Sequence, residues 1–402
     1  MFEKITKNIK GDKYIWVIVL ILSLFSLLAV YSSTGTLAYK YRAGNTEYYL
    51  IKQVLIIGGG LVLMYLTHLI NYKYFSRISQ ILYYLSIILL VLTLFFGTDI
   101  NEAKRWITLP GVNLTFQTSD LAKFALIMYL ARMLSKKQDM VRSFSEGFWP
   151  TIFPVFIICG LIAPEDLSSA LVLFSTSVLV MFVGRIHIAY IGGLIALSVI
   201  TIGLFITLLF TLPEESMPGR MTTWKARIVS FMNTDGEEPY QLVQSKIAIA
   251  KGGFIPNGPG NSTQRNFLPH PYSDFIYAII IEEYSFFGGV FVVFLYLAFL
   301  IRSGLIVRKS PKAFGALLAF GLALSLTIQA MINMGVAVGL LPVTGLTLPL
   351  VSMGGSSTIF VSLAFGIILS VSRDIEQLEL GIDESEMSLE DLIMGSEEIE
   401  QE

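Results

Sequence analysis

The chain consists largely of apolar stretches about 20 residues long, and these constrain its fold more than any other feature. An α-helix needs about 20 apolar residues to cross a bilayer. Ten stretches reach or approach this length: residues 14–33, 50–70, 78–97, 117–134, 148–163, 167–184, 187–212, 274–302, 312–337 and 352–372. The sequence therefore predicts an all-α polytopic membrane protein with about ten transmembrane helices.

The composition excludes most other classes of protein. Only 14% of the residues are charged, against roughly 25% in soluble globular domains. The apolar runs are continuous rather than alternating, which excludes a transmembrane barrel. Cys159 is the only cysteine, so neither an internal disulfide nor a cysteine metal site can form. The three histidines, His68, His187 and His270, are too far apart for a zinc motif.

Lysine and arginine set the expected orientation, because short cytoplasmic loops carry an excess of them. Residues 1–13 contain four lysines, and placing them in the cytoplasm puts most short-loop cations on the same side. The short outer loops then hold only Lys40, Arg42, Lys104 and Arg105. Both termini are expected in the cytoplasm, and the large loop 213–273, before the eighth helix, is expected outside.

The C-terminal segment 374–402 differs from the rest in charge. It contains twelve acidic residues and no lysine or arginine, a composition typical of a solvated, disordered extension. Two roles remain open for it, a solubilising tail or a docking site for a partner.

The large outer loop is expected to be folded. Residues 240–250 have one apolar side at helical spacing, which predicts an amphipathic helix on the outer membrane surface. Gly252-Gly253 and Gly258-Pro259-Gly260 then end it.

Three acids mark the re-entry of this loop into the membrane. Acidic residues are costly inside a bilayer and need a reason. Asp274 precedes an apolar run, so it could cap the helix or accept a proton. Glu282 and Glu283 follow about two turns later, rotated from Asp274 by about 80° and 180° in a straight helix. Both cannot share its face, and Glu283 is favoured as conformationally important.

Other polar residues interrupt the apolar pattern at the same outer end. Thr118, Ser119 or Asp120 could cap the helix at 117–134. Lys123 must then snorkel or pair, for example with Asp166, which could itself cap the next helix.

The segment 339–357 contains two prolines and four glycines. This composition predicts broken backbone that protein must cover or that lines a wet cavity. Cations at the outer end, Arg105, Lys123 and Arg227, would hold phosphate. The pattern favours an anionic, lipid-linked substrate. The sequence contains no Walker A loop, HExxH motif or nucleophile elbow, and nothing in it indicates nucleic-acid binding.

These same stretches resemble the SEDS family (shape, elongation, division and sporulation), whose members include FtsW, RodA and SpoVE. The resemblance covers most of residues 14–373. It is carried by residues 103–107, 109–111, 116–123, 166–167, 241–245, 268–269, 273–276, 282–283, 333 and 339–357.

The resemblance implies a peptidoglycan glycosyltransferase that polymerises lipid II, an undecaprenyl pyrophosphate-linked disaccharide peptide. The expected place is the outer face of the bacterial inner membrane, and the expected partners are a class B penicillin-binding protein and other divisome membrane proteins. Asp274 corresponds to the family's essential carboxylate. The expected substrate-binding residues are Arg105, Lys123, Asp166, Arg227, Gln241, Gln244, Ser245, Glu283 and Ser356. Thr347-Leu348-Pro349 looks more like the division branch than the elongation branch.

The chain departs from the family pattern in several places. His270 follows Pro269 where the family has glutamate, and Ser273 stands before Asp274 where it has histidine or threonine. Asp120 ends the segment that usually reads Gln-Pro-Ser-Glu, and Tyr284-Ser285 replaces Leu-Gly.

The mechanistic hypothesis is an inverting transfer without a covalent intermediate. Asp274 accepts the proton of the acceptor sugar's 4-hydroxyl, and Arg105, Lys123 or Arg227 stabilise the leaving pyrophosphate. No cofactor is specified, although a divalent cation (Mg²⁺ or Mn²⁺) could assist at the pyrophosphate. Two alternatives are a lipid II flippase, which needs a polar path open to both faces, and a non-catalytic scaffold that recruits a penicillin-binding protein.

Overall fold

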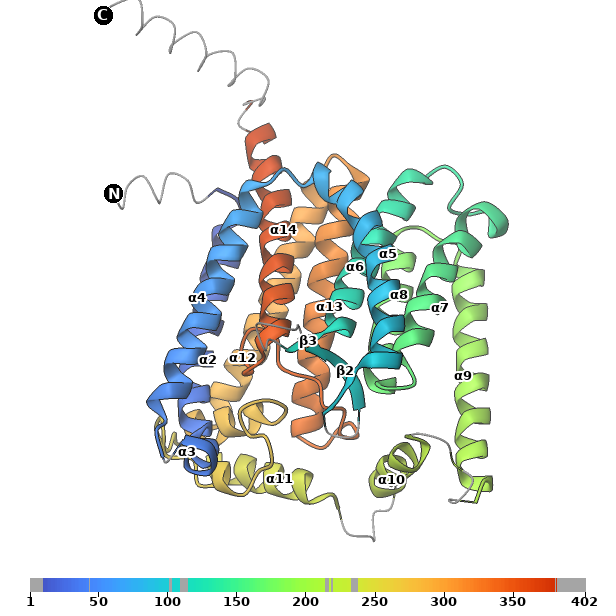
Figure 1. Ribbon diagram of the computed structural model, residues 1–402. Coiled ribbons are helices and arrows are strands. Elements are labelled where there is room, and N and C mark those ends of the chain that lie inside the picture. Colours follow the sequence, from blue (N-terminus) through green and yellow to red (C-terminus); the bar gives the residue numbers. More distant parts are fainter. Residues whose placement is uncertain are drawn as a thin grey trace, which may run out of the picture.

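The computed structural model describes residues 10–42, 44–100, 103–108, 115–213, 217, 220–232, 238–379 and 381. Its long helices run side by side as one bundle (Figure 1). The helices are α2 (Lys13–Ser33), α3 (Gly35–Arg42), α4 (Glu47–Leu69), α5 (Lys73–Phe96), α6 (Thr118–Lys136), α7 (Trp149–Ile162), α8 (Leu167–Val183), α9 (Ile188–Thr211), α10 (Met221–Met232), α11 (Tyr240–Gly252), α12 (Ile276–Lys309), α13 (Ala313–Ala337) and α14 (Gly355–Glu379).

The all-α polytopic class predicted from the apolar runs is confirmed. Within the described residues, eight helices are long and apolar enough to cross a membrane. Two further predicted spans coincide with α8, which is 17 residues long, and with α6, which carries Asp120, Lys123, Arg132 and Lys136. The number of crossings stays a prediction.

The bundle is organised around α13 and α14. In the most apolar 18-residue stretch of each helix, 61% and 67% of the residues are buried. The corresponding share in α9 is 11%, and α9 stands at the edge of the bundle (Figure 1). α6 packs against α13 and α5, and α14 packs against α4. The helices that form the core therefore also present their ends to the site described below.

The described ends of the chain meet at one end of the bundle. The Gly11 N–H donates to Glu376 at 2.5 Å, and Arg302 on α12 pairs with Asp12 at 2.5 Å. Which side of the membrane this end faces stays a prediction, and residues 1–9 and 382–402 lie outside the described part.

A small antiparallel sheet at the opposite end was not predicted. It joins β1 (Thr98–Ile100), β2 (Ala103–Thr108) and β3 (Thr115–Gln117) in that order, with Trp106 opposite Gln117. Strand preference depends strongly on packing context, and here the sheet packs beside the start of α6 and against α14.

The large loop is folded where the structure describes it, as predicted. It contains α10, α11 and a 3₁₀ turn at Gln264–Asn266. The predicted helix at 240–250 is α11, which packs against α12. Gly252 permits this contact, because a β-carbon there would lie 2.1 Å from the Ile281 carbonyl oxygen.

Two segments interrupt the helices near the site. Residues 338–354, between α13 and α14, are non-helical, which confirms the predicted break. Asn333 and Gln329 on α13 donate to the carbonyls of Leu346 and Thr347 at 2.6 and 2.9 Å, so protein covers this backbone. In α12, Ser285 has φ +68° and kinks the helix.

Candidate active site

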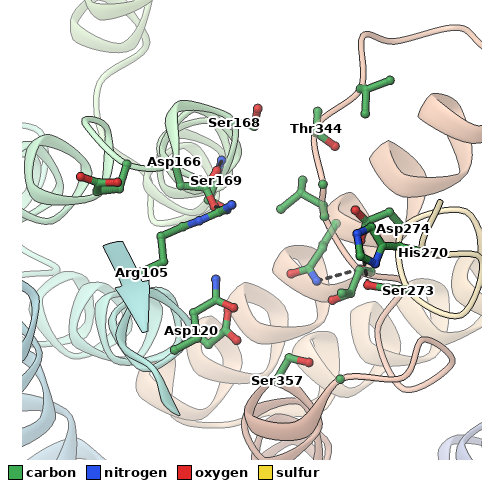
Figure 2. A pocket seen from close by; sticks show the side chains of 18 of the residues that line it. Arg105, Asp120, Asp166, Ser168, Ser169, His270, Ser273, Asp274, Thr344 and Ser357 are labelled. Atoms are coloured by element: carbon green, nitrogen blue, oxygen red, sulfur yellow. Dashed lines mark hydrogen bonds and ion pairs between the residues drawn. The ribbon is translucent and has the colours of Figure 1, made fainter. Parts of the chain in front are cut away.

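A cavity of about 460 Å³ lies at the end of the bundle that carries the sheet. Its walls come from β2, the first turns of α6 and α8, α10, the start of α11, the turn before α12, and the broken segment after α13. Figure 2 shows Arg105, Asp120 and Asp166 on one wall and His270, Ser273 and Asp274 on the facing wall. Segments far apart in the sequence therefore meet in one polar cavity.

Six of the ten residues predicted for the site line this cavity. Each comes from a different segment of the chain, and they are Arg105, Lys123, Asp166, Arg227, Gln241 and Asp274.

The other four predicted residues do not line it. Ser245 is buried and donates to the Ala337 carbonyl at 2.6 Å, and Gln244 lies on α11 outside the lining. Ser356 accepts a hydrogen bond from the Gln117 N–H at 3.3 Å, while its neighbour Ser357 faces the cavity. Glu283 is buried elsewhere, in contact with the loop before α12.

Asp274 lies in the turn that leads into α12. Ser273 Oγ donates to Asp274 Oδ1 at 2.7 Å, and Asn333 Nδ2 donates to the Asp274 carbonyl at 2.9 Å. Gly345 faces its carboxylate, because a β-carbon at Gly345 would lie 3.8 Å from Oδ2. These contacts fix both the backbone and one carboxylate oxygen.

Of the two roles that the sequence left open for Asp274, the cap of α12 is wrong. The cap position is Phe275, and no side chain caps this helix. The turn carries the chain one residue further before the helix begins, so the Asp274 carboxylate faces the cavity.

Burial raises the pKa of the Asp274 carboxyl above its usual range. The hydrogen bond from Ser273 and then the positive charges of His270, Arg105 and Arg227 oppose this rise in pKa. A carboxylate with a raised pKa is a stronger base than an exposed aspartate, which suits proton abstraction at neutral pH.

Arg105 and Asp166 form an ion pair across the cavity wall. Arg105 Nη1 lies 2.7 Å from Asp166 Oδ2, with side-chain exposures of 22% and 6%. Asp166 also caps α8, since its Oδ1 accepts the Ser169 N–H at 3.0 Å. The predicted cap is thus confirmed, and the same carboxylate holds Arg105 beside the cavity.

Lys123 pairs with Asp120 rather than with Asp166. Lys123 Nζ lies 2.7 Å from Asp120 Oδ1, one turn away on α6. The predicted cap of α6 by Thr118, Ser119 or Asp120 is wrong, because the cap position is Gln117 and no side chain accepts there. Asp166 is engaged by Arg105, so the nearest carboxylate to Lys123 is the one on its own helix.

Several cavity residues were missed in the sequence. They are Asp120, Arg220, His270 and Thr344. Arg220 and Arg227 are seven residues apart, which is close to two helical turns and places them on one face. That spacing was the available signal for Arg220, whose Nη1 donates to the Glu165 carbonyl at 2.5 Å.

The two glutamates of α12 bind the loop before it, outside the cavity. Glu282 accepts the Thr263 and Gln264 N–H groups at 3.0 and 3.2 Å and also the Ser262 hydroxyl. Glu283 accepts the Ser262 N–H at 3.2 Å and the Ser32 hydroxyl. Both therefore tie residues 262–264 to the kinked start of α12, in line with a supporting role.

Searches for related proteins match the chain over most of its length. A family model for cell cycle proteins of the FtsW/RodA/SpoVE type matches residues 12–377. Stage V sporulation protein E of Bacillus subtilis is 33% identical over 378 residues, covering 92% of this chain and 98% of that protein. The probable peptidoglycan glycosyltransferase FtsW of Trichlorobacter lovleyi is 33% identical over 388 residues, covering 94% and 97%.

Solved structures have the same fold. A chain from the structure of a peptidoglycan synthase complex, described as coordinating polymerization and crosslinking, is 27% identical with a TM-score of 0.68, covering 91% of this chain and 99% of that chain. The crystal structure of the rod shape determining protein RodA of Thermus thermophilus is 26% identical with a TM-score of 0.64, covering 90% and 97%.

Proposed function

This chain belongs to the FtsW/RodA/SpoVE family, and from that premise we propose that it is a peptidoglycan glycosyltransferase that polymerises lipid II with Asp274 as general base. The observation that carries the proposal is the position of Asp274, a carboxylate of raised pKa facing a cavity lined with cationic side chains. Relatives at 33% identity carry the same activity in their names.

The reaction is an inverting transfer. Asp274 accepts the proton of the acceptor sugar's 4-hydroxyl while the oxygen of that hydroxyl attacks the anomeric carbon of the growing chain. The bond from that carbon to the pyrophosphate breaks, and undecaprenyl pyrophosphate leaves. General-base help of this kind is typically worth about 10²–10⁴-fold in rate.

The cavity's cations suit the leaving group. Arg105, Arg220, Arg227 and Lys123 all line it, and arginine presents a planar fork that matches phosphate oxygens. Two of them are held by carboxylates, Arg105 by Asp166 and Lys123 by Asp120, so their positions are set before substrate arrives. Charge that develops on the pyrophosphate is then stabilised without rearrangement.

A divalent cation remains a secondary proposal. Among the described residues, no three His, Cys, Asp or Glu side chains gather as metal ligands. Mg²⁺ is commonly bound by one or two carboxylates together with substrate phosphates, so a cation would enter with the pyrophosphate. The step at Asp274 does not depend on it.

We place the enzyme in the bacterial inner membrane, with the cavity on the outer face and both termini in the cytoplasm. The proposed partner is a class B penicillin-binding protein, supported by the likeness to a chain of a peptidoglycan synthase complex. A septal role, together with other divisome proteins, is favoured by the FtsW relatives. An elongation role like that of RodA is the alternative.

Polymerisation and flipping of lipid II can be separated by experiment. The purified chain and its class B partner are incubated with lipid II, and glycan strands are resolved on a gel. Glycan strands are expected, and their absence in the presence of a correctly folded class B partner would refute the proposal. In sealed liposomes that contain only this chain, labelled lipid II is expected to stay in its leaflet; crossing would favour the flippase.

A further inference from the structure

A second cavity of about 390 Å³ adjoins the cavity that holds Asp274, which is called the main cavity below. The two cavities share three residues, Arg227 on α10, Gln241 on α11 and Val343 in the broken segment after α13. Figure 1 shows α10 and α11 at the end of the bundle that carries the sheet. These three residues therefore form the boundary between the main cavity and the second cavity.

The helix α10 presents a different side to each cavity. Trp224 and Arg227 line the main cavity, and Thr223, Arg227, Ser230 and Phe231 line the second cavity. The residues of the second set are three or four positions apart, which places them on one side of a helix. Because Arg227 belongs to both sets, a ligand that extends from the main cavity past Arg227 enters the second cavity.

The lining of the second cavity suits sugar rings. It combines apolar side chains, such as Phe231 and Leu242, with the hydroxyls of Thr223 and Ser230. Ser230 Oγ donates to the Arg227 carbonyl at 3.1 Å, and a hydroxyl oxygen can accept a further hydrogen bond. Sugar rings have apolar C–H faces and hydroxyl edges, so they match a mostly apolar lining with a few placed polar groups.

The position of the second cavity disfavours a polyprenyl chain as its ligand. Among the described residues that line it, none lies on a helix long and apolar enough to cross a membrane. They belong to α10, to Pro239 and the start of α11, and to residues 342–343. A polyprenyl chain is apolar throughout, so it remains with the bilayer and the helices that cross it.

We propose that the second cavity binds the growing glycan strand, so that sugars already joined lie beyond Arg227 while the reacting end stays at Asp274. The inference rests on the proposed function, in which the growing chain is the donor. A cavity of about 460 Å³ has the size that holds a drug-sized ligand, so the main cavity accommodates the reacting sugars but not a polymer. A strand held at a second place keeps its end at high local concentration near the base between transfers. The second cavity therefore sets how many transfers occur before the strand is released.

The test fills the second cavity and measures strand length with the full chain, its class B partner and lipid II. Ser230→Trp places a large side chain there, and Thr222→Trp, at an exposed position that lines neither cavity, is the matched control. For Ser230→Trp we expect the mean strand length to fall at least about fivefold, because weakened binding acts mainly through faster dissociation. The first transfer, between two single lipid II molecules, should stay within about threefold of the wild-type rate, since its donor carries little chain to bind there. Thr222→Trp should match wild type in both measurements.

A double variant keeps the proposal testable if Ser230→Trp does not fold. Thr223→Val combined with Ser230→Ala removes both hydroxyls without filling the cavity, and its strands should be at least about twofold shorter than those of wild type. Wild-type strand lengths in either folded variant overturn the proposal. Equal shortening in Thr222→Trp also overturns it, because the effect would then not come from the cavity.

The same assay identifies a polyprenyl ligand. If the second cavity held the polyprenyl chain, Ser230→Trp would raise the KM for lipid II and slow the first transfer as much as later ones, with strand lengths unchanged; this result overturns the strand site. Failure of the proposed function is distinguishable, because wild type would then make no strands. If wild type makes strands whose length Ser230→Trp does not alter, only the strand site fails.

Discussion

Arg105 Nη1 lies 2.7 Å from Asp166 Oδ2, and the same carboxylate caps α8 through the Ser169 N–H. One side chain thus joins the β2 strand to the helix beside it and fixes a cation at the cavity. The pair is mostly buried, at 22% and 6% side-chain exposure. Its loss should therefore lower the free energy of unfolding more than the loss of a surface ion pair does.

Substitutions of Asp166 should separate its two roles. Asn caps helices about as well as Asp but carries no charge. We expect Asp166→Asn to keep the cap but lose the ion pair, at a cost above the roughly 1 kcal/mol of a surface pair, and to lower kcat/KM by about tenfold because Arg105 loses its anchor. Asp166→Ala should lose the cap as well, at an added cost of about 1–2 kcal/mol. Thermal melts and lipid II kinetics of both variants check this, and equal melting temperatures would contradict the cap.

Asn333 should matter for rate more than for binding. Its Nδ2 donates to the Asp274 and Leu346 carbonyls, at 2.9 and 2.6 Å, and so holds the base against the broken segment. We expect Asn333→Ala to lower kcat by about 10–100-fold, since displacement of a reacting group by about 1 Å costs roughly that much. Tyr296→Phe is the control, because the Tyr296 hydroxyl bonds Pro349 of the same segment, away from Asp274. Equal kcat losses in both variants would argue against a specific role for Asn333.

Glu282 should stabilise the fold without taking part in the chemistry. Glu282→Ala leaves the buried Gln264 N–H and the partly buried Thr263 N–H without their acceptor. We expect a cost of about 3 kcal/mol with faster hydrogen exchange at residues 262–264. Glu238→Ala, which removes an exposed pair with Lys246, should cost less than about 1 kcal/mol. Similar melting temperatures for the two variants would refute the supporting role of Glu282.

Asp274 should cost stability when it is ionised. Burial raises its pKa in the folded state, so the charged carboxylate opposes folding at neutral pH. That cost disappears as pH falls through the folded-state pKa. Asp274→Asn should therefore melt at a higher temperature than wild type at pH 7, by on the order of a degree or two, with a difference that shrinks in acid. A lower melting temperature at pH 7 would contradict this. In wild type, the acid limb of kcat/KM should lie above the usual aspartate range.

Much of the architecture was predictable because it follows from local sequence. Each continuous apolar run coincides with a helix of the bundle, since only a helix satisfies its own backbone in lipid. The break at 338–354 followed from its prolines and glycines, and α11 followed from the period of residues 240–250. The cavity residues Arg105, Lys123, Asp166 and Asp274 stood out because charge at the end of an apolar run needs a reason.

The pairings within the site were not predictable in the same way. Lys123 pairs with Asp120 because Asp166 is engaged by Arg105. The pairing of Arg105 with Asp166 depends on where β2 crosses the ends of α6 and α8. Asp274 fails to cap α12 because the turn runs on to Phe275. Glu282 and Glu283 both bind the loop at residues 262–264. A straight helix did not suggest this, because its geometry does not show that the loop contacts the helix just before the kink at Ser285.

The most direct test of the account is the rate at which Asp274→Asn makes glycan strands from lipid II. The purified variant, wild type and Asp139→Asn, which alters an exposed acid outside the cavity, are assayed with the same class B partner. Wild type and Asp139→Asn are predicted to polymerise at equal rates, and Asp274→Asn at least about 100-fold more slowly while remaining folded. Glycan strands made by Asp274→Asn at the wild-type rate would contradict the assignment of the general base.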